Sequence, residues 1–137
     1  MSNKMYEVVA HTADLQLIIF GTTKDELFKH ALQGMFEVIK PSYTTNTLIE
    51  YTVQVTSANL ELLLADFLSE ALYLSDVHSL AFRKAKILSL TDTEIKATLF
   101  GSKISGFEVV EIKAVTYHDL QVKHENNQWR AQVVFDI

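Results

Sequence analysis

The sequence predicts an α+β fold: a two-layer sandwich in which a mostly antiparallel or mixed β-sheet carries two α-helices on one face. Three observations predict it. Two long segments have apolar residues at helical spacing, several shorter segments alternate apolar and polar residues, and the second half of the chain holds strand patterns only. The 137 residues, 48% of them apolar, contain no repeat or linker. We therefore expect a single domain over residues 1–137 with its own core.

The first elements are a pair of strands and a helix. Residues 6–9 and 15–20 read as strands, the second with alternating apolar positions. The "TKDE" that follows is a capping box: the Thr23 hydroxyl accepts from an early helix amide and the Glu26 side chain reaches back to the cap amide. The helix then ends at Lys40, because a residue before proline disfavours helix. Its apolar stripe consists of Leu27, Phe28, Ala31, Leu32, Met35, Phe36 and Ile39.

A second strand and helix follow a turn. Residues 49–55 alternate cleanly and predict a half-buried strand. The helix begins near Ser57 or Asn59, since both residue types are good N-caps, and ends near Ser75–Asp76. Its wide apolar stripe, which predicts deep burial, consists of Leu60, Leu62, Leu63, Leu64, Ala65, Phe67, Leu68, Ala71 and Leu72.

The rest of the chain predicts strands only. They cover residues 81–90, 94–100, 112–117, 120–124 and 129–137. The turns between them include "TDT" and "ENNQ", whose Asn residues tolerate positive φ.

Composition excludes several classes of protein. The chain has no Cys, which removes disulfides, thiolate metal sites and Cys nucleophiles. The net charge is −5, the pI is about 5.5 and the basic residues are scattered, so we expect no direct nucleic-acid binding. No signal peptide and no apolar run of about 20 residues is present, which indicates a cytoplasmic protein without membrane contact.

Carboxylates at two distant places suggest a metal site. Asp14 stands at the start of an early strand, and the last strand runs into Asp136 and the α-carboxylate of Ile137. If these strands are neighbours, the three groups converge and repel, so protons or a cation must compensate. Oxygen ligands suit a hard divalent ion, calcium first and magnesium second. The simpler alternative is that Asp14 ends a turn and accepts local backbone amides.

Other polar residues are candidates to face a partner or a nucleotide. They are His11, Thr12, Lys113, Thr116 and His118. The cation, hydroxyl and imidazole of "KAVTYH" could contact a phosphate or a partner's carboxylate. The simpler interpretation of that segment is an ordinary amphipathic strand. The simpler interpretation of His11 is a half-buried imidazole whose hydrogen bonds are satisfied. No Gly-rich phosphate loop, HExxH motif or nucleophile elbow is present.

Taken together, "HTAD", "TKDELFKHALQGMFEVI", "LELLLADFLSEALYLSD", "KAVTYH" and the terminal "FDI" resemble the archease family over essentially the whole chain. The resemblance implies an α+β fold and a non-enzymatic role as an accessory protein of an RtcB-type RNA ligase in tRNA splicing and RNA repair. Such proteins promote guanylylation of the ligase's active-site His from GTP, and so allow multiple turnover. It also implies that Asp14, Asp136 and Ile137 hold a divalent cation.

The sequence departs from the family pattern at two places. Ala10 stands where the family commonly has an Asp, which lowers the local acidity. The segment "GSKISGFEVVEIK" is shorter than in the family and has no His. Two other functions stay open: a small metal-dependent hydrolase with His11 as base, and a chaperone-like protein with a structural ion.

Overall fold

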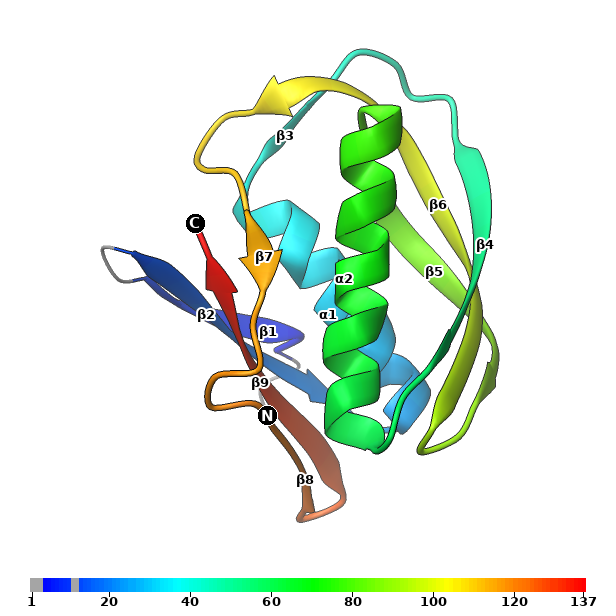
Figure 1. Ribbon diagram of the computed structural model, residues 1–137, viewed down its shortest axis with the longest axis vertical. Helices are drawn as coiled ribbons and strands as arrows, with labels where there is room; N and C mark the ends of the chain where they lie inside the picture. The colour runs from blue at the N-terminus through cyan, green and yellow to red at the C-terminus, as the bar shows by residue number, and fades with distance from the viewer. Residues whose placement is uncertain (1–3, 11–12) are drawn as a thin grey trace.

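The computed structural model describes residues 4–10 and 13–137, which form nine strands and two helices (Figure 1). The elements are β1 (Tyr6–Ala10), β2 (Asp14–Gly21), α1 (Lys24–Val38), β3 (Pro41–Tyr43), β4 (Ile49–Thr56), α2 (Leu60–His78), β5 (Leu80–Leu90), β6 (Glu94–Phe107), β7 (Ala114–Val115), β8 (Gln121–Glu125) and β9 (Gln128–Asp136).

The strands are divided between two sheets. The first has the order β1-β2-β9-β7, and β8 also pairs with β9. The second has the order β3-β6-β4, and β5 also pairs with β6. Every described pairing is antiparallel. The α+β class with mostly antiparallel strands is therefore confirmed.

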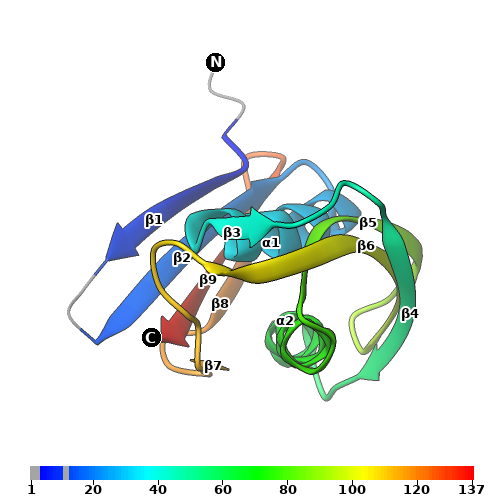
Figure 2. The ribbon, with the colours of Figure 1, turned by 90° about the horizontal axis from the view of Figure 1, so that it is seen from above.

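Both helices contact both sheets, which differs from the predicted single sheet with two helices on one face. Helix α1 packs against β2 of the first sheet and β5 of the second, and α2 packs against β4, β5 and β7 (Figure 2). Phe36 of α1 meets Phe82 of β5 edge to face with ring centroids 5.8 Å apart, and Phe28 meets Phe67 of α2 at 5.7 Å. These fully buried rings join the layers into one core.

One of the two hydrogen bonds predicted for the N-terminal capping box of α1 forms in the structure. The Thr23 hydroxyl accepts a hydrogen bond from the Glu26 amide at 3.1 Å. The Glu26 carboxylate, however, accepts from the amide and hydroxyl of Thr22, one residue before the cap. The close approach of α1 to the end of β2 requires glycine there: a Cβ on Gly21 would lie 2.6 Å from the Leu27 amide nitrogen.

The later elements show where local pattern was insufficient. Asn59, one of the two candidate caps, begins α2, and the helix extends to His78, beyond the predicted end. The residues predicted as a strand over 112–117 contribute only β7. Strand β3 was not predicted, and it pairs with the extension of β6 beyond Phe100. Neither described helix is of a length and apolarity that would cross a membrane.

Candidate functional site

Asp14 and Asp136 face each other across neighbouring strands. Strands β2 and β9 are antiparallel partners, and their register pairs Asp14 directly with Asp136. Directly opposed residues place their side chains on the same face of a sheet, with Cβ atoms about 5 Å apart. Leu15 and Phe135, the next pair in the register, are buried in the core, so both carboxylates lie on the outer face.

Residue 137 continues the same ladder. The amide of Ile137 donates to the carbonyl of Ala13 in a long hydrogen bond of 3.5 Å. The backbone of residue 137 thus lies beside the start of β2, next to Asp14. The three groups predicted from the sequence therefore lie at the same end of two neighbouring strands, β2 and β9. Their role as metal ligands stays a prediction.

The paired carboxylates have no cationic partner in the part of the chain that the structure describes. The ion pairs found there are Lys4–Glu7, Lys24–Asp92 and His118–Asp119. Two carboxylates about 5 Å apart repel by about 3 kcal/mol at an effective dielectric near 20, and by less where water screens them. Asp14 is half-buried and Asp136 is exposed, so the repulsion is partly screened.

The oxygen-only character of this group fits a hard divalent cation. Outside the two gaps at 1–3 and 11–12, no three His, Cys, Asp or Glu side chains are placed to hold a metal ion. The predicted set has two such side chains, and its third member is predicted to be the main-chain carboxylate of residue 137. A cation there would also take water ligands wherever three carboxylates that bind through one oxygen each leave positions of calcium open.

Residues 113–119, which include β7 and the turn after it, lie beside the carboxylates. The Lys113 amide donates to the Asp136 carbonyl at 2.8 Å, and the Thr116 amide and hydroxyl both donate to the Val134 carbonyl, the hydroxyl at 2.8 Å. These bonds position a depression of about 380 Å³. It is lined by Asp14, Gln16, His118, Asp119 and Val134.

The residues predicted to face a partner or nucleotide are separated by the structure. His118 lines the depression, and its Nε2 lies 3.2 Å from the Asp119 carboxylate. The Thr116 hydroxyl is used in a backbone hydrogen bond, and Lys113 lines a different hollow beside α2. His11 and Thr12 lie outside the described residues.

Two polar residues of the depression, Gln16 and Asp119, were not predicted as part of a site. Gln16 follows Asp14 by two positions in a strand, so alternation alone places it on the same face. Asp119 adopts a left-handed backbone with φ of 52°, a conformation that Asp tolerates in turns and that no pattern in the sequence indicates.

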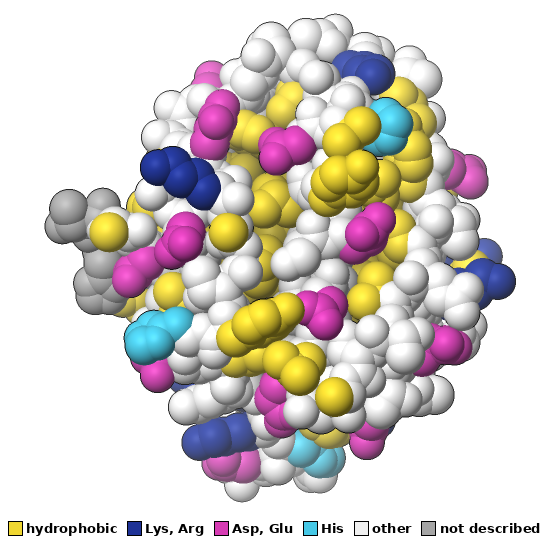
Figure 3. All heavy atoms as spheres, in the orientation of Figure 1, with side chains coloured by type: hydrophobic (Ala, Val, Ile, Leu, Met, Phe, Trp, Pro, Cys, Tyr) yellow, Lys and Arg dark blue, Asp and Glu magenta, His cyan; other side chains and the backbone are white. Residues whose placement is uncertain are grey.

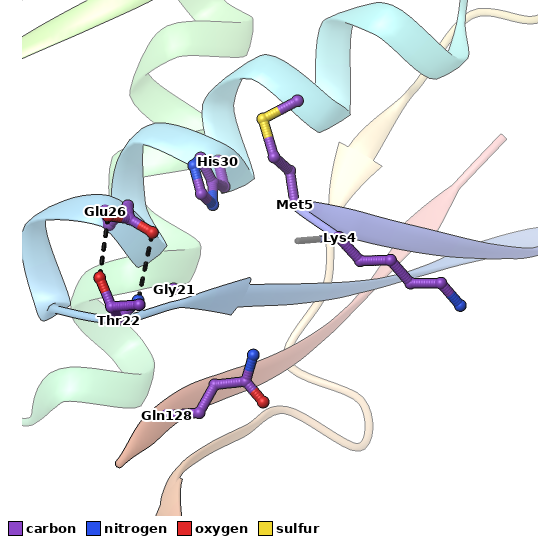
Figure 4. Close-up of a pocket in the computed structure, with 7 residues that line it drawn as sticks. All are labelled: Lys4, Met5, Gly21, Thr22, Glu26, His30 and Gln128. Carbon is purple, nitrogen blue, oxygen red and sulfur yellow. Dashed lines mark hydrogen bonds between the residues drawn. The ribbon is translucent and has the colours of Figure 1, made fainter. Parts of the chain in front are cut away.

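A second concavity, of about 260 Å³, lies at the opposite end of β2 (Figure 4). It is lined by Lys4, Met5, Gly21, Thr22, Glu26, His30 and Gln128. The hydrogen bonds from Thr22 hold the pKa of the Glu26 carboxyl below its usual value. His30 Nδ1 lies 2.6 Å from the Phe20 carbonyl, and a carbonyl can only accept, so this nitrogen carries the proton. These polar groups are thus largely engaged within the protein.

The chain matches known proteins over nearly its whole length. A model of the archease protein family (MTH1598/TM1083) matches residues 6–137. The chain is 40% identical to a protein archease of Methanosarcina mazei, across 98% of this chain and 97% of that one. It is 31% identical to a protein archease of Pyrococcus furiosus, across 98% of this chain and 99% of that one.

Two solved structures share the fold. The solution structure of Methanobacterium thermoautotrophicum protein 1598 aligns with a TM-score of 0.72 at 25% identity, covering 97% of this chain and 99% of that one. The crystal structure of an archease from Thermotoga maritima, described as a possible chaperone, aligns with a TM-score of 0.67 at 22% identity, covering 99% and 100%. With a family match across residues 6–137 and relatives this similar, the chain belongs to the archease family.

Proposed function

We propose that this protein activates an RtcB-type RNA ligase by promoting transfer of GMP from GTP to the ligase's active-site His. The observation that carries the proposal is the cross-strand pair of Asp14 and Asp136 beside residue 137 in a chain of the archease family. The sequence resemblance implies that members of this family act on the ligase. It also implies that Asp14, Asp136 and Ile137 hold a divalent cation. In this proposal the protein turns over no substrate of its own.

The carboxylates would hold a divalent cation, calcium in the first place. Such an ion supplies positive charge to oxygen ligands of an incoming group. Asp14 and Asp136 would hold the ion through side-chain oxygens, and residue 137 would hold it through its carboxylate. His118 and Asp119 line the same depression, so their side chains would limit which groups can approach the ion. A net charge of −5 would speed encounter with a ligase cleft that is positive because it binds RNA and GTP.

Single-turnover guanylylation of a purified ligase with radiolabelled GTP tests this function. We expect the rate to rise with added protein, and to fall to the unassisted rate with Asp14→Ala or Asp136→Ala. Glu50→Ala is the matched control, because Glu50 is exposed on β4 in the other sheet. An unchanged rate at saturating wild-type protein contradicts the proposal.

Metal binding has a test that does not depend on the ligase. Calorimetric titration with calcium should give about one site per chain in the wild type, and no heat of binding in Asp14→Ala. A few residues added after Ile137 should weaken binding too, because they remove the carboxylate and leave every side chain intact. Hydrolysis of a generic phosphate ester by the isolated protein would instead support a metal-dependent hydrolase.

A further inference from the structure

A groove runs along the C-terminal half of α2, apart from the carboxylate site. Two hollows make it up, of about 260 and 120 Å³, and Asp76 lines both. The first lies between α2 and β7, and the second between the end of α2 and the end of β6. Figure 3 shows hydrophobic side chains on the floor of a hollow on this face, with acidic side chains around it.

Large apolar side chains in contact with solvent lie on and beside α2, and one of them, Tyr73, lines the first hollow. Tyr73 is 60% exposed and Val77 is 54% exposed, and they lie one helical turn apart on α2. Tyr117, 59% exposed, follows β7. Its hydroxyl donates to Asp66 of α2 at 2.6 Å, which ties the loop to the helix. Exposed aromatic and aliphatic side chains grouped in this way are typical of binding surfaces.

Acidic side chains outnumber basic ones around the groove. Asp76 lines both hollows and Glu111 lines the second, whereas Lys113 is the one basic residue lining them. Asp66 and Glu70 lie nearer the N-terminal end of the same helix. None of the four acids forms an ion pair within the described residues. The rim therefore presents uncompensated negative charge beside apolar surface.

We propose that this groove binds a basic segment of a partner protein, one in which Lys or Arg residues alternate with aliphatic or aromatic side chains. The apolar side chains would contact Tyr73, Val77 and Tyr117, and the cations would meet the acidic rim. A second copy of this chain suits the surface poorly, because it would bring the same acids and a further net charge of −5. The inference stands independently of the ligase proposal, since it concerns another part of the surface.

Fluorescence anisotropy with labelled peptides tests the groove directly. The probes are KLKLKLK and its acidic counterpart ELELELE, titrated with the full chain. We expect the basic peptide to bind with a Kd in the micromolar range, roughly tenfold more weakly in 500 mM than in 50 mM NaCl. The acidic peptide should not bind. Equal binding of both peptides, or none by the basic one, overturns the proposal.

Substitutions then locate the site. Asp76→Lys should weaken peptide binding by at least roughly tenfold, and Tyr73→Ser should weaken it with little change in its salt dependence. The matched control is Glu50→Lys, an identical charge change on β4 that lies outside both hollows and should leave the affinity nearly unchanged. If Glu50→Lys weakens binding as much as Asp76→Lys, the attraction is to overall charge and the proposal fails. It also fails if sedimentation shows a dimer of the wild type that Tyr73→Ser dissociates.

Discussion

Replacing Asp14 by Asn should change the stability of the protein in opposite directions with and without calcium. Without a divalent ion, the substitution removes the repulsion between Asp14 and Asp136, so the variant should be more stable than the wild type. With calcium, the wild type should gain stability from binding and the variant should gain much less, since it has lost a charged ligand. The order of the two melting temperatures should therefore reverse.

The magnitude follows from the register of β2 and β9. Directly opposed carboxylates about 5 Å apart repel by about 3 kcal/mol at an effective dielectric near 20, and by about 0.8 kcal/mol in bulk water. Because Asp136 is exposed, we expect a value near the lower limit, about 1 kcal/mol, or roughly 4 °C for a chain of this size. Saturating calcium at about 100 times its Kd should stabilise the wild type by about 2.7 kcal/mol.

Thermal unfolding followed by circular dichroism, in EDTA and in calcium, measures both effects. Glu50→Gln is the control, because it removes one exposed carboxylate from β4 and should shift neither melting temperature appreciably. A lower melting temperature of Asp14→Asn in EDTA would show that the Asp14 carboxylate makes favourable contacts instead of repelling Asp136. An equal gain from calcium in both proteins would show that the ion binds elsewhere.

Other substitutions probe the core, the helix cap and the groove. Phe135→Ala should lower the free energy of unfolding by about 3 to 5 kcal/mol, measured by urea denaturation, because Phe135 is fully buried on β9. Thr23→Ala should cost about 1 kcal/mol in the same assay, because it removes the hydroxyl that accepts from the Glu26 amide. The hydrogen bond to Asp66 raises the pKa of Tyr117, so ultraviolet titration of Asp66→Asn should show tyrosinate forming at lower pH. The same bond stabilises the fold below the ordinary tyrosine pKa, and this contribution is lost as pH rises through the raised value.

Local sequence patterns correctly predicted the helices and strands whose apolar spacing matches the period of the backbone. The apolar stripe from Leu27 to Ile39 repeats at helical period, and every member of it is buried in the structure. Strand β2 alternates strictly, with Leu15, Leu17 and Ile19 in the core. In these segments the spacing of side chains and the period of the backbone agree, so no distant contact was needed to predict them.

The division into two sheets depended on pairings between distant segments. Strand β6 is long enough to pair with β4 and β5 along one part and with β3 along another, and no local pattern specifies those partners. Strand β3, with a proline first and no alternation, exists through that pairing. Strand β7 has two residues, and beyond it the Thr116 amide and hydroxyl both donate to the Val134 carbonyl.

In the candidate site, too, the local sequence pattern predicted some placements, whereas others depended on the pairing of distant strands. That Asp14 and Gln16 share a face followed from alternation, but their meeting with Asp136 required the register of β2 and β9. The resemblance to the archease family implied that Asp14 and Asp136 lie together, and the register of the two strands shows them side by side. Lys113 lies beside α2 while His118 lines the depression with Asp14, and neither alternation nor resemblance predicted this separation.

Strand β7 lies between the carboxylate site and the groove. On one side the Lys113 amide holds the Asp136 carbonyl, and Ala114 pairs with Asp136 in the ladder. On the other side Lys113, Ala114 and Val115 line the groove against α2. A segment bound in the groove would therefore lie against the strand that positions one of the two carboxylates. We therefore expect the protein's affinity for the peptide and its affinity for calcium to be linked. If the peptide tightens calcium binding, calcium must tighten peptide binding by the same factor. Titrating the basic peptide in EDTA and in calcium measures that factor from one side, and titrating calcium with and without peptide measures it from the other.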